Sequence, residues 1–152
     1  MLLNEAVAAT RILIVEDEAI IALDLRQRLQ TLGFEVTGIA VNGADAERLA
    51  LSTHPGLILM DITIQGPRDG IETAKAIQAA MDVPVVFLTA HADTATIRRA
   101  KVTKPYGYLV KPVLPDKLLE AIREVRAGGV PMSRSIARQV IEFFHHPPPS
   151  PT

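Results

Sequence analysis

The stretch Leu57-Ile58-Leu59-Met60-Asp61 decides the fold class, because four apolar residues are followed at once by a carboxylate. An apolar run of this length without polar alternation is typical of a strand that is buried on both faces of a parallel sheet. An ionised carboxyl group at the end of such a strand costs free energy unless it has partners. We therefore predict that Asp61 belongs to a functional site.

Three further strand-like runs also end in polar or charged residues, which are Glu16 with Asp17, Thr89, and Lys111. In open parallel sheets, ligands bind outside the carboxyl ends of the strands. If the four runs are neighbouring parallel strands, these side chains meet Asp61 in one crevice. The pattern therefore predicts a single site built from positions that are far apart in the sequence.

The strand-like runs alternate with helix-like stretches, and they occupy residues 11–16, 35–40, 57–61, 84–89 and 106–110. This alternation predicts an α/β fold, a doubly wound parallel sheet flanked by helices on both faces. The first helix shows the expected pattern most clearly. Its apolar residues recur at the helical period, at Ile21, Leu25, Leu29 and Leu32. Gly33 then provides a stop.

The other helices carry their own start and stop signals. Asn42 and Asp93 are suited to cap the second and fourth helices. The third helix follows Asp69-Gly70, and the fifth begins at Pro115, a residue suited to a first turn. Gly128-Gly129 then breaks the fifth helix.

Length and composition favour one domain with an extension. The chain has 152 residues, of which 48% are hydrophobic, so it can form one substantial core but not two ordinary domains. No apolar stretch approaches the roughly 20 residues of a membrane span, and the start of the chain lacks the pattern of a secretory signal. We therefore predict a cytoplasmic protein that does not contact membranes.

The residue types exclude several classes of chemistry. The absence of cysteine rules out disulfides, thiolate nucleophiles and zinc–thiolate sites, and the four histidines show no metal-ligand spacing. The formal net charge of −1 argues against direct nucleic-acid binding by this stretch, because such surfaces need clustered lysine and arginine.

The character of the chain changes after the fifth helix. We divide it into a domain at residues 10–128 and a C-terminal region at residues 129–152. Ser133 can cap a further amphipathic helix in that region. Its apolar side would hold Ile136, Val140, Phe143 and Phe144. The proline-rich residues 147–151 favour an extended linker.

The predicted crevice is suited to phosphoryl chemistry. Three carboxylates close together repel one another unless a cation lies among them, and oxygen donors without histidine or thiolate suit Mg²⁺. Lys111 adds a positive charge and Thr89 a hydroxyl donor. The partner missing from such a site is an anion with several oxygens, namely a phosphoryl group transferred to Asp61.

These residues, in this order, resemble the CheY-like receiver domain of bacterial two-component response regulators. The motifs that carry the resemblance are Glu16-Asp17, Asp61, Thr89-Ala90, and Lys111-Pro112 with Tyr108 three positions before the lysine. The resemblance implies a five-stranded sheet in the order 2-1-3-4-5 with five flanking helices. It also implies a switch in a phosphorelay rather than an enzyme, a protein that catalyses only its own phosphorylation and dephosphorylation.

The resemblance assigns a role to each residue of the crevice. Asp61 would be the nucleophile and phosphoacceptor, while Lys111 and Thr89 would contact the phosphoryl oxygens. The implied ligands of Mg²⁺ are Asp17 directly, Glu16 through water, Asp61, and the carbonyl oxygen of Thr63.

The switch residues implied by the resemblance are Thr89 and Tyr108. Phosphorylation would draw Thr89 towards the site, and Tyr108 would turn from an outward to an inward orientation. The peptide bond between Lys111 and Pro112 would be cis, a form that only about 5% of X–Pro bonds adopt in folded proteins.

The implied phosphodonor is the phosphohistidine of a sensor histidine kinase or of a histidine phosphotransfer protein. A homodimer would use either the face made by the fourth helix, fifth strand and fifth helix, or the C-terminal helix. Residues 128–144 resemble the connector that precedes a helix-turn-helix DNA-binding output. We therefore favour part of a longer transcription regulator over a stand-alone signalling module.

Two departures from the family pattern accompany the resemblance. The loop from Asp61 to Asp69 is one residue longer than is commonest, with Gln65 where proline is usual, and residues 104–107 replace a Gly-Ala pair. Two alternative functions remain. An aspartate-nucleophile phosphohydrolase would need an acid at position 63, where this chain has Thr63. An interaction module with a vestigial pocket would not respond to Mg²⁺.

Overall fold

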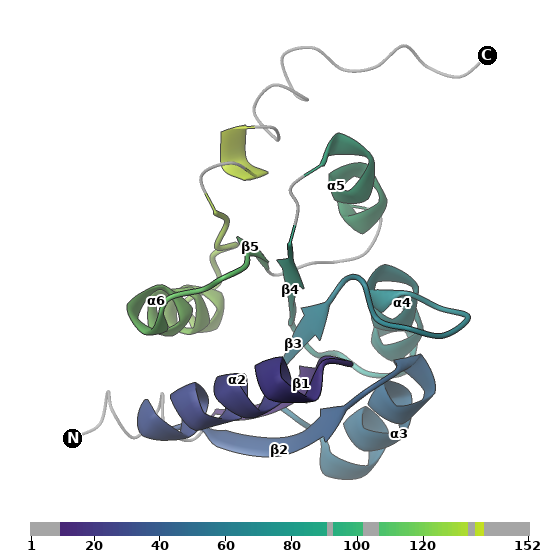
Figure 1. The fold of residues 1–152 in the computed structure, drawn as a ribbon, viewed down its shortest axis with the longest axis horizontal. Coiled ribbons are helices and arrows are strands. Elements are labelled where there is room, and N and C mark those ends of the chain that lie inside the picture. The colour runs from purple at the N-terminus through teal and green to yellow at the C-terminus, as the bar shows by residue number, and fades with distance from the viewer. Residues whose placement is uncertain (1–9, 91–92, 102–106, 134–135, 139–152) are drawn as a thin grey trace.

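The structure is a computed structural model that describes residues 10–90, 93–101, 107–133 and 136–138. Its centre is a five-stranded parallel sheet in the order β2-β1-β3-β4-β5 (Figure 1). The strands are β1 Arg11–Val15, β2 Glu35–Ala40, β3 Leu57–Asp61, β4 Val85–Thr89 and β5 Gly107–Val110. The predicted fold class and the strand order implied by the resemblance are confirmed.

The described helices cover both faces of the sheet (Figure 1). They are α2 Ala19–Thr31, α3 Gly43–Thr53, α4 Gly70–Ala80, α5 Thr94–Lys101 and α6 Pro115–Arg126. Residues of α2 and α6 pack in one core cluster, and residues of α3, α4 and α5 pack in another on the opposite face. None of the helices in the described part of the chain has the length and apolar character that a membrane span requires.

The central strands are the most deeply buried elements. Every residue of β3 and of β4 is buried, as expected for strands that helices cover on both faces. Full burial of a large aliphatic or aromatic side chain stabilises the fold by about 1.5–3 kcal/mol. The apolar runs therefore hold rigid the strand ends at which Asp61 and Thr89 lie.

Side-chain caps begin three of the helices. The carboxamide of Asn42 accepts the N–H of Asp45 at 2.8 Å at the start of α3. The carboxylate of Asp93 likewise accepts the N–H of Thr96 at 2.8 Å beside α5. These two predicted caps are confirmed, and Asp69 acts in the same way at the start of α4.

The predicted helix ends also agree with the structure. Gly33 has φ 96° and Gly128 has φ 90°, a left-handed conformation that suits glycine after a helix. Pro115 is the first residue of α6. Two strands differ slightly from the prediction. β4 begins at Val85 and not at residue 84, because proline has no N–H to pair, and β1 ends at Val15 and not at residue 16. Residue 106, the predicted start of β5, lies outside the described residues.

Ser133 contacts both β5 and a short helical turn in the C-terminal region. The backbone carbonyl of Ser133 accepts the N–H of Ala137 at 2.9 Å, at a short helical turn over residues 136–138. Its hydroxyl accepts the N–H of Val110 in β5 at 2.8 Å. The prediction that this hydroxyl caps the helix involves residues 134 and 135, which lie outside the described residues. Ile136 is fully buried. The other predicted apolar positions, Val140, Phe143 and Phe144, lie outside the described residues.

Candidate functional site

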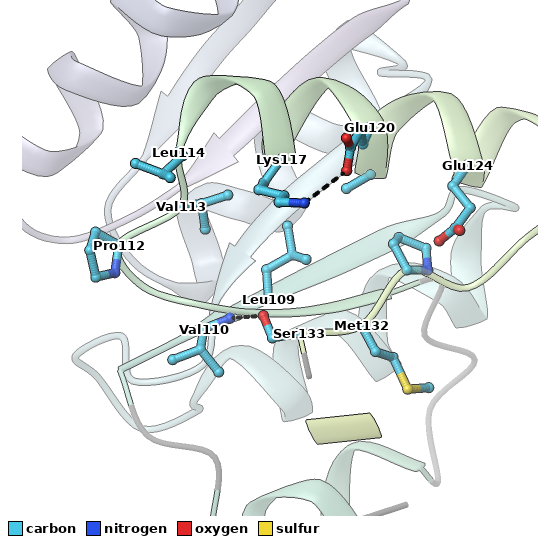
Figure 2. A pocket seen from close by; sticks show the side chains of 12 residues that line it. Leu109, Val110, Pro112, Val113, Leu114, Lys117, Glu120, Glu124, Met132 and Ser133 are labelled. Carbon is cyan, nitrogen blue, oxygen red and sulfur yellow. Dashed lines mark hydrogen bonds and ion pairs between the residues drawn. The ribbon is translucent and has the colours of Figure 1, made fainter. Parts of the chain in front are cut away.

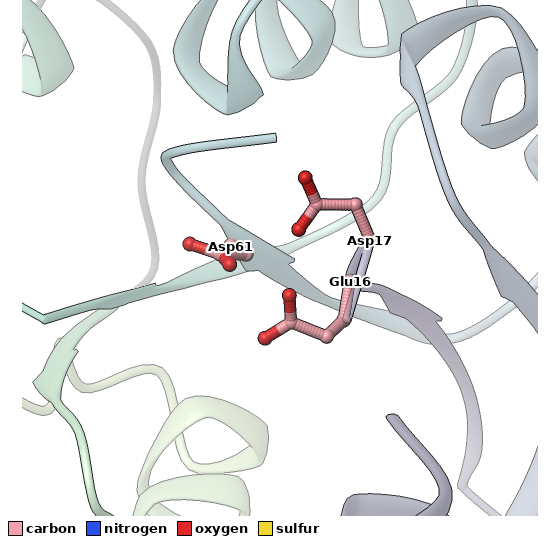
Figure 3. Close-up of side chains that lie close together, drawn as sticks. All are labelled: Glu16, Asp17 and Asp61. Atoms are coloured by element: carbon pink, nitrogen blue, oxygen red, sulfur yellow. The ribbon is translucent and has the colours of Figure 1, made fainter. Parts of the chain in front are cut away.

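Three carboxylates converge at the carboxyl ends of β1 and β3. Glu16 and Asp17 follow β1, Asp61 ends β3, and one oxygen from each lies within 4.8 Å of the others (Figure 3). Glu16 is 1% exposed and Asp61 is 3% exposed. The parallel pairing of Val15 with Met60 places the two strand ends side by side. The predicted meeting of these three acids is therefore present in the structure.

Lys111, which directly follows β5, joins the acids at the same edge of the sheet. Its Nζ donates to Glu16 Oε1 at 2.7 Å and to Asp61 Oδ2 at 2.9 Å. Its backbone N–H donates to the carbonyl of Thr89 at 2.8 Å, and the peptide bond to Pro112 is cis, as the resemblance implied. One ammonium group thus bridges two buried carboxylates that are distant in the sequence.

The loop after β3 supplies the remaining contacts of Asp61. The backbone N–H of Thr63 donates to Asp61 Oδ1 at 3.0 Å, and the hydroxyl of Thr63 donates to the same oxygen at 3.2 Å. Because Lys111 contacts Oδ2, both oxygens of Asp61 accept hydrogen bonds. These contacts fix the orientation of the carboxylate.

The same loop reaches back to the first strand. The N–H of Gln65, the residue that departs from the family pattern, donates to Asp17 Oδ2 at 3.1 Å. Glu16 Oε2 accepts the N–H of Glu18 at 3.2 Å. The lengthened loop therefore closes over the acids and contacts one of the predicted metal ligands.

The surroundings of the site shift the pKa values of Glu16 and Asp61 in opposite directions. Burial raises the pKa of Glu16 to about 7, although its hydrogen bond to Lys111 acts in the opposite direction. Burial also opposes ionisation of Asp61, but its hydrogen bonds to Glu16 and Lys111 outweigh this and hold the pKa below its ordinary value. At neutral pH Asp61 is therefore ionised, while Glu16 titrates near neutrality.

The donor set fits a hard divalent cation. Three carboxylates and one ammonium leave a formal charge of −3 + 1 = −2 when all the acids are ionised. The donors are all oxygens, which suits Mg²⁺ better than the softer transition metals. Asp17 is partly exposed at the mouth of the cluster, so its carboxylate is accessible to an ion.

The two predicted switch residues lie on neighbouring strands. Thr89 is buried at the end of β4, opposite Val110 of β5. Tyr108 is 3% exposed and stacks on Phe87 with ring centroids 5.8 Å apart. Burial raises the pKa of the Tyr108 phenol. The structure thus contains the inward orientation of Tyr108, and its movement on phosphorylation stays a prediction.

Sequence reasoning missed the contribution of Gly70 to the site. A Cβ atom at Gly70 would overlap the carbonyl oxygen of Asp61 and lie 2.8 Å from Cα of Ile62. The N–H of Gly70 donates to the carbonyl of Ile62 at 2.8 Å, so the first turn of α4 packs directly against the backbone of the acidic site. The Asp69-Gly70 pair indicated a helix start, but only the folded chain shows this close approach.

A comparison with protein families places this fold and site in a known class. The family model for the response regulator receiver domain matches residues 12–123. That match spans well over half of the chain. The chain therefore belongs to the response regulator receiver domain family, the class of signalling switches in two-component systems.

Two curated relatives illustrate the similarity. The transcriptional regulatory protein PdtaR of Mycobacterium tuberculosis is 38% identical over 118 residues, which cover 78% of this chain and 57% of that protein. The phyllosphere-induced regulator PhyR of Methylorubrum extorquens is 33% identical over 117 residues, which cover 76% of this chain and 43% of that protein. The chain thus spans less than two thirds of the length of either relative.

Solved structures show the same fold. A two-component response regulator of the LuxR family from Aurantimonas sp. superimposes with a TM-score of 0.84 at 28% identity, over 91% of this chain and 99% of that one. The signal receiver domain of a modulated diguanylate cyclase from Desulfovibrio desulfuricans gives a TM-score of 0.73 at 36% identity, over 88% and 98% of the two chains.

Proposed function

We propose that this chain is a Mg²⁺-dependent phosphoacceptor switch in which Asp61 receives a phosphoryl group from a phosphohistidine. The donor would be a sensor histidine kinase or a histidine phosphotransfer protein. The observation that carries the proposal is the bridge of the Lys111 ammonium between Asp61 and Glu16. It holds an ionised carboxylate beside a cation that can neutralise the charge of a transferred phosphoryl group.

The transfer step needs no further reactant. An oxygen of the ionised Asp61 attacks phosphorus, a P–O bond forms, and the P–N bond to the imidazole of the donor breaks. The electron pair of the broken bond stays on the imidazole nitrogen, which takes a proton from solvent. The product is an acyl phosphate on Asp61, and catalysis is confined to the formation and loss of this group.

Each residue of the site has a proposed role. Asp17 would bind Mg²⁺ directly, Glu16 through water, and the third side-chain ligand would be Asp61. The carbonyl of Thr63 would complete the protein ligands. When bound, Mg²⁺ would neutralise phosphoryl oxygens and orient the group for in-line transfer.

Lys111 and Thr89 would hold the phosphoryl group after transfer. Lys111 would keep its contact with Asp61 and pair with one phosphoryl oxygen, and the Thr89 hydroxyl would donate to another. Phosphorylation adds about −1.5 to −2 charges and three acceptor oxygens. Thr89 is therefore drawn inward, and the inward orientation of Tyr108 is favoured on the neighbouring strand.

The consequence of this movement would be a change in the face made by α5, β5 and α6. We propose that self-association or a downstream target uses that face or the C-terminal helix. The change is a shift between two populations, limited by how differently the phosphoryl group stabilises them. A DNA-binding output following this chain, and a cytoplasmic setting, belong to the same proposal.

We propose that the phosphodonor binds at an apolar cavity beside the site. The cavity measures about 480 Å³ and lies between α2 and the residues that follow β5. Lys111 itself is part of its lining, and Ile20 beside it is 84% exposed. A donor that packs an apolar surface here brings its phosphohistidine next to Asp61, because the cavity is continuous with the residue that bridges the acids.

The proposal is tested with a small phosphodonor. We expect incubation with Mg²⁺ and acetyl phosphate to add one phosphoryl group to the purified chain, seen as a mass increase. Asp61→Asn should abolish the increase, and a chelator should abolish it in the unchanged chain. Asp82→Asn is the matched control, because Asp82 is exposed in the loop between α4 and β4, at the opposite edge of the sheet from Asp61. An unchanged mass in the wild type would contradict the proposal.

A further inference from the structure

Residues that follow α6 form hydrogen bonds with the outer edge of β5. The N–H of Tyr108 donates to the carbonyl of Pro131 at 2.9 Å, and the N–H of Ser133 donates to the carbonyl of Tyr108 at 3.0 Å. The hydroxyl of Ser133 accepts the N–H of Val110 at 2.8 Å (Figure 2). Residues 131–133 therefore occupy the place of a further strand, with Met132 paired in parallel to Tyr108.

This pairing provides partners for backbone groups that an edge strand would otherwise leave unpaired. β5 is the last strand of the sheet, so one side of its backbone has no partner within the sheet. The segment 131–133 satisfies the two N–H groups of β5 that face outward, those of Tyr108 and Val110. The second of these bonds uses a side chain, so it depends on the residue type at position 133.

An apolar anchor holds the same segment against the core. Ile136 is fully buried in the core cluster that contains Tyr108, and Met132 packs against that cluster. The segment also forms one wall of a cavity of about 580 Å³ whose other wall is α6 (Figure 2). Any displacement of the segment therefore changes both the surroundings of Tyr108 and the shape of this cavity.

The absence of a side chain at Gly107 makes the close contact possible. A Cβ atom at this position would lie 2.8 Å from Cγ of Pro131 and 3.0 Å from its carbonyl oxygen. That oxygen is the acceptor for the Tyr108 N–H. The pairing of the segment with β5 thus depends on the missing side chain of Gly107 at one end and on the hydroxyl of Ser133 at the other.

The segment is connected to the acidic site through only a few bonds. Val110, whose N–H donates to Ser133, lies opposite Thr89 in the β4–β5 pairing. The next residue, Lys111, donates its N–H to the carbonyl of Thr89 and its Nζ to Asp61. A shift of β5 therefore changes the positions of both Thr89 and Lys111, the residues that would hold the phosphoryl group.

We propose that residues 131–133 and Ile136 form a latch that closes on β5 as one unit and that closes more tightly when Asp61 is phosphorylated. The coupling rests on the function proposed above. The structure contains the closed latch together with the inward orientation of Tyr108, the orientation that phosphorylation favours. Because a coupling free energy between two sites is reciprocal, opening the latch also makes the phosphorylated state of Asp61 less favourable.

Amide hydrogen exchange, followed residue by residue by NMR on the full chain, tests whether the latch closes as one unit. Ser133→Ala removes the acceptor of Val110 but leaves the acceptor of Tyr108 in place. Gly107→Ala crowds Pro131 but leaves the acceptor of Val110 in place. We expect each variant to speed exchange at both amides by a similar factor, about three- to tenfold for one lost hydrogen bond.

Two matched variants control for the chemical changes. Ser52→Ala removes an exposed hydroxyl from α3, and a Cβ at Gly38 in β2 would meet only ordinary contacts at 3.5 Å or more, so Gly38→Ala repeats the glycine change. Neither should alter exchange in β5. Amides of β3 report global unfolding and should stay unchanged throughout. If Ser133→Ala speeds only Val110 and Gly107→Ala speeds only Tyr108, the contacts are independent and the latch is disproved.

The coupling is tested by repeating the measurement with Mg²⁺ and acetyl phosphate while intact mass records the phosphoryl content of the same sample. We expect exchange at Tyr108 and Val110 to slow by at least about threefold, as tighter closure requires, and not to slow in Asp61→Asn. Unchanged exchange in a fully phosphorylated sample would overturn the coupling. No gain in mass would overturn the proposed function instead. The exchange measurements on the variants without acetyl phosphate would still decide whether the latch closes as one unit.

Discussion

The carboxyl end of the central strands and the outer edge of β5 are held together by different forces. At the centre, Lys111 bridges two carboxylates that are each no more than 4% exposed in their side chains. At the edge, backbone hydrogen bonds, the hydroxyl of Ser133 and one buried isoleucine hold the C-terminal segment in place. The comparison teaches that this receiver separates a charged centre, where we propose that phosphoryl transfer takes place, from an edge of low charge, which we propose responds to it.

The physical basis of the difference is the strength of each kind of contact. Charges in a buried site interact strongly, so losing one partner leaves an uncompensated charge. A neutral hydrogen bond contributes only about 0.5–1.5 kcal/mol net, so an edge built from a few of them opens at modest cost. The centre is therefore rigid, and the edge can respond to small changes at Thr89 and Tyr108.

The largest expected effect tests whether the C-terminal segment packs against the core of the domain. Ile136→Ala should lower the free energy of unfolding by about 3 kcal/mol, because it removes a fully buried side chain and leaves a cavity. Urea unfolding measures the change. Ile20→Ala is the control, since Ile20 is 84% exposed and its loss should cost less than about 0.5 kcal/mol. Equal costs for the two variants would mean that the segment does not pack on the sheet.

The next effect concerns the charged centre. Lys111→Ala should slow phosphorylation by acetyl phosphate about 100-fold, because it removes the cation that would stabilise the transferred group. The rate of mass increase under excess donor provides the measurement. Lys117→Ala removes an exposed lysine of α6 that pairs with Glu120 at 3.5 Å, and it should leave the rate unchanged. Equal rates in Lys111→Ala and wild type would remove this lysine from the chemistry.

A smaller effect follows from the proton on Glu16. Since burial raises the pKa of Glu16 to about 7, this carboxyl is largely neutral below that pH and attracts a cation less. Mg²⁺ affinity should therefore rise by about tenfold, or 1.4 kcal/mol, between about pH 6 and about pH 8, because Glu16 must release one proton when the ion binds. Calorimetric titration measures this dependence, and Glu16→Gln should flatten it. A flat profile in the wild type would contradict the role of Glu16 in the ion site.

The smallest effect concerns Tyr108, the predicted switch residue that lies between the two regions. Among the described residues, the buried hydroxyl of Tyr108 has no hydrogen-bond partner. Tyr108→Phe should therefore leave the free energy of unfolding unchanged or raise it by up to about 1 kcal/mol, because an unsatisfied polar group is removed from the core. Thermal and urea unfolding check this value. A clear loss of stability would show that the hydroxyl has a bonding role in the folded chain.

Sequence reasoning succeeded where one local pattern carried the information. Apolar runs that end in Asp61 and Lys111 predicted both the parallel sheet and the meeting of the charged groups, since strand ends in such sheets lie at one edge. Caps such as Asn42 were readable because the cap and its bonded N–H are three residues apart. Both kinds of signal are local or follow from the topology.

The rest depended on close approaches between distant parts of the backbone. Gly70 against the carbonyl of Asp61, and Gly107 against Pro131, are contacts that no periodic pattern encodes. The hydroxyl of Ser133 could cap a helix or bond a strand edge, and its sequence neighbours favour the first use. Only the position of β5 shows that this hydroxyl bonds the strand edge.

The central claim is that Asp61 carries a labile acyl phosphate, and the most direct test locates that group. The chain is incubated with Mg²⁺ and acetyl phosphate, reduced with borohydride, which converts an aspartyl phosphate to the alcohol homoserine, and digested for peptide mass spectrometry. Our account predicts homoserine at position 61 alone, formed only when both donor and Mg²⁺ are present. Reduction at another acidic residue, or none anywhere in a sample with the donor, would contradict it.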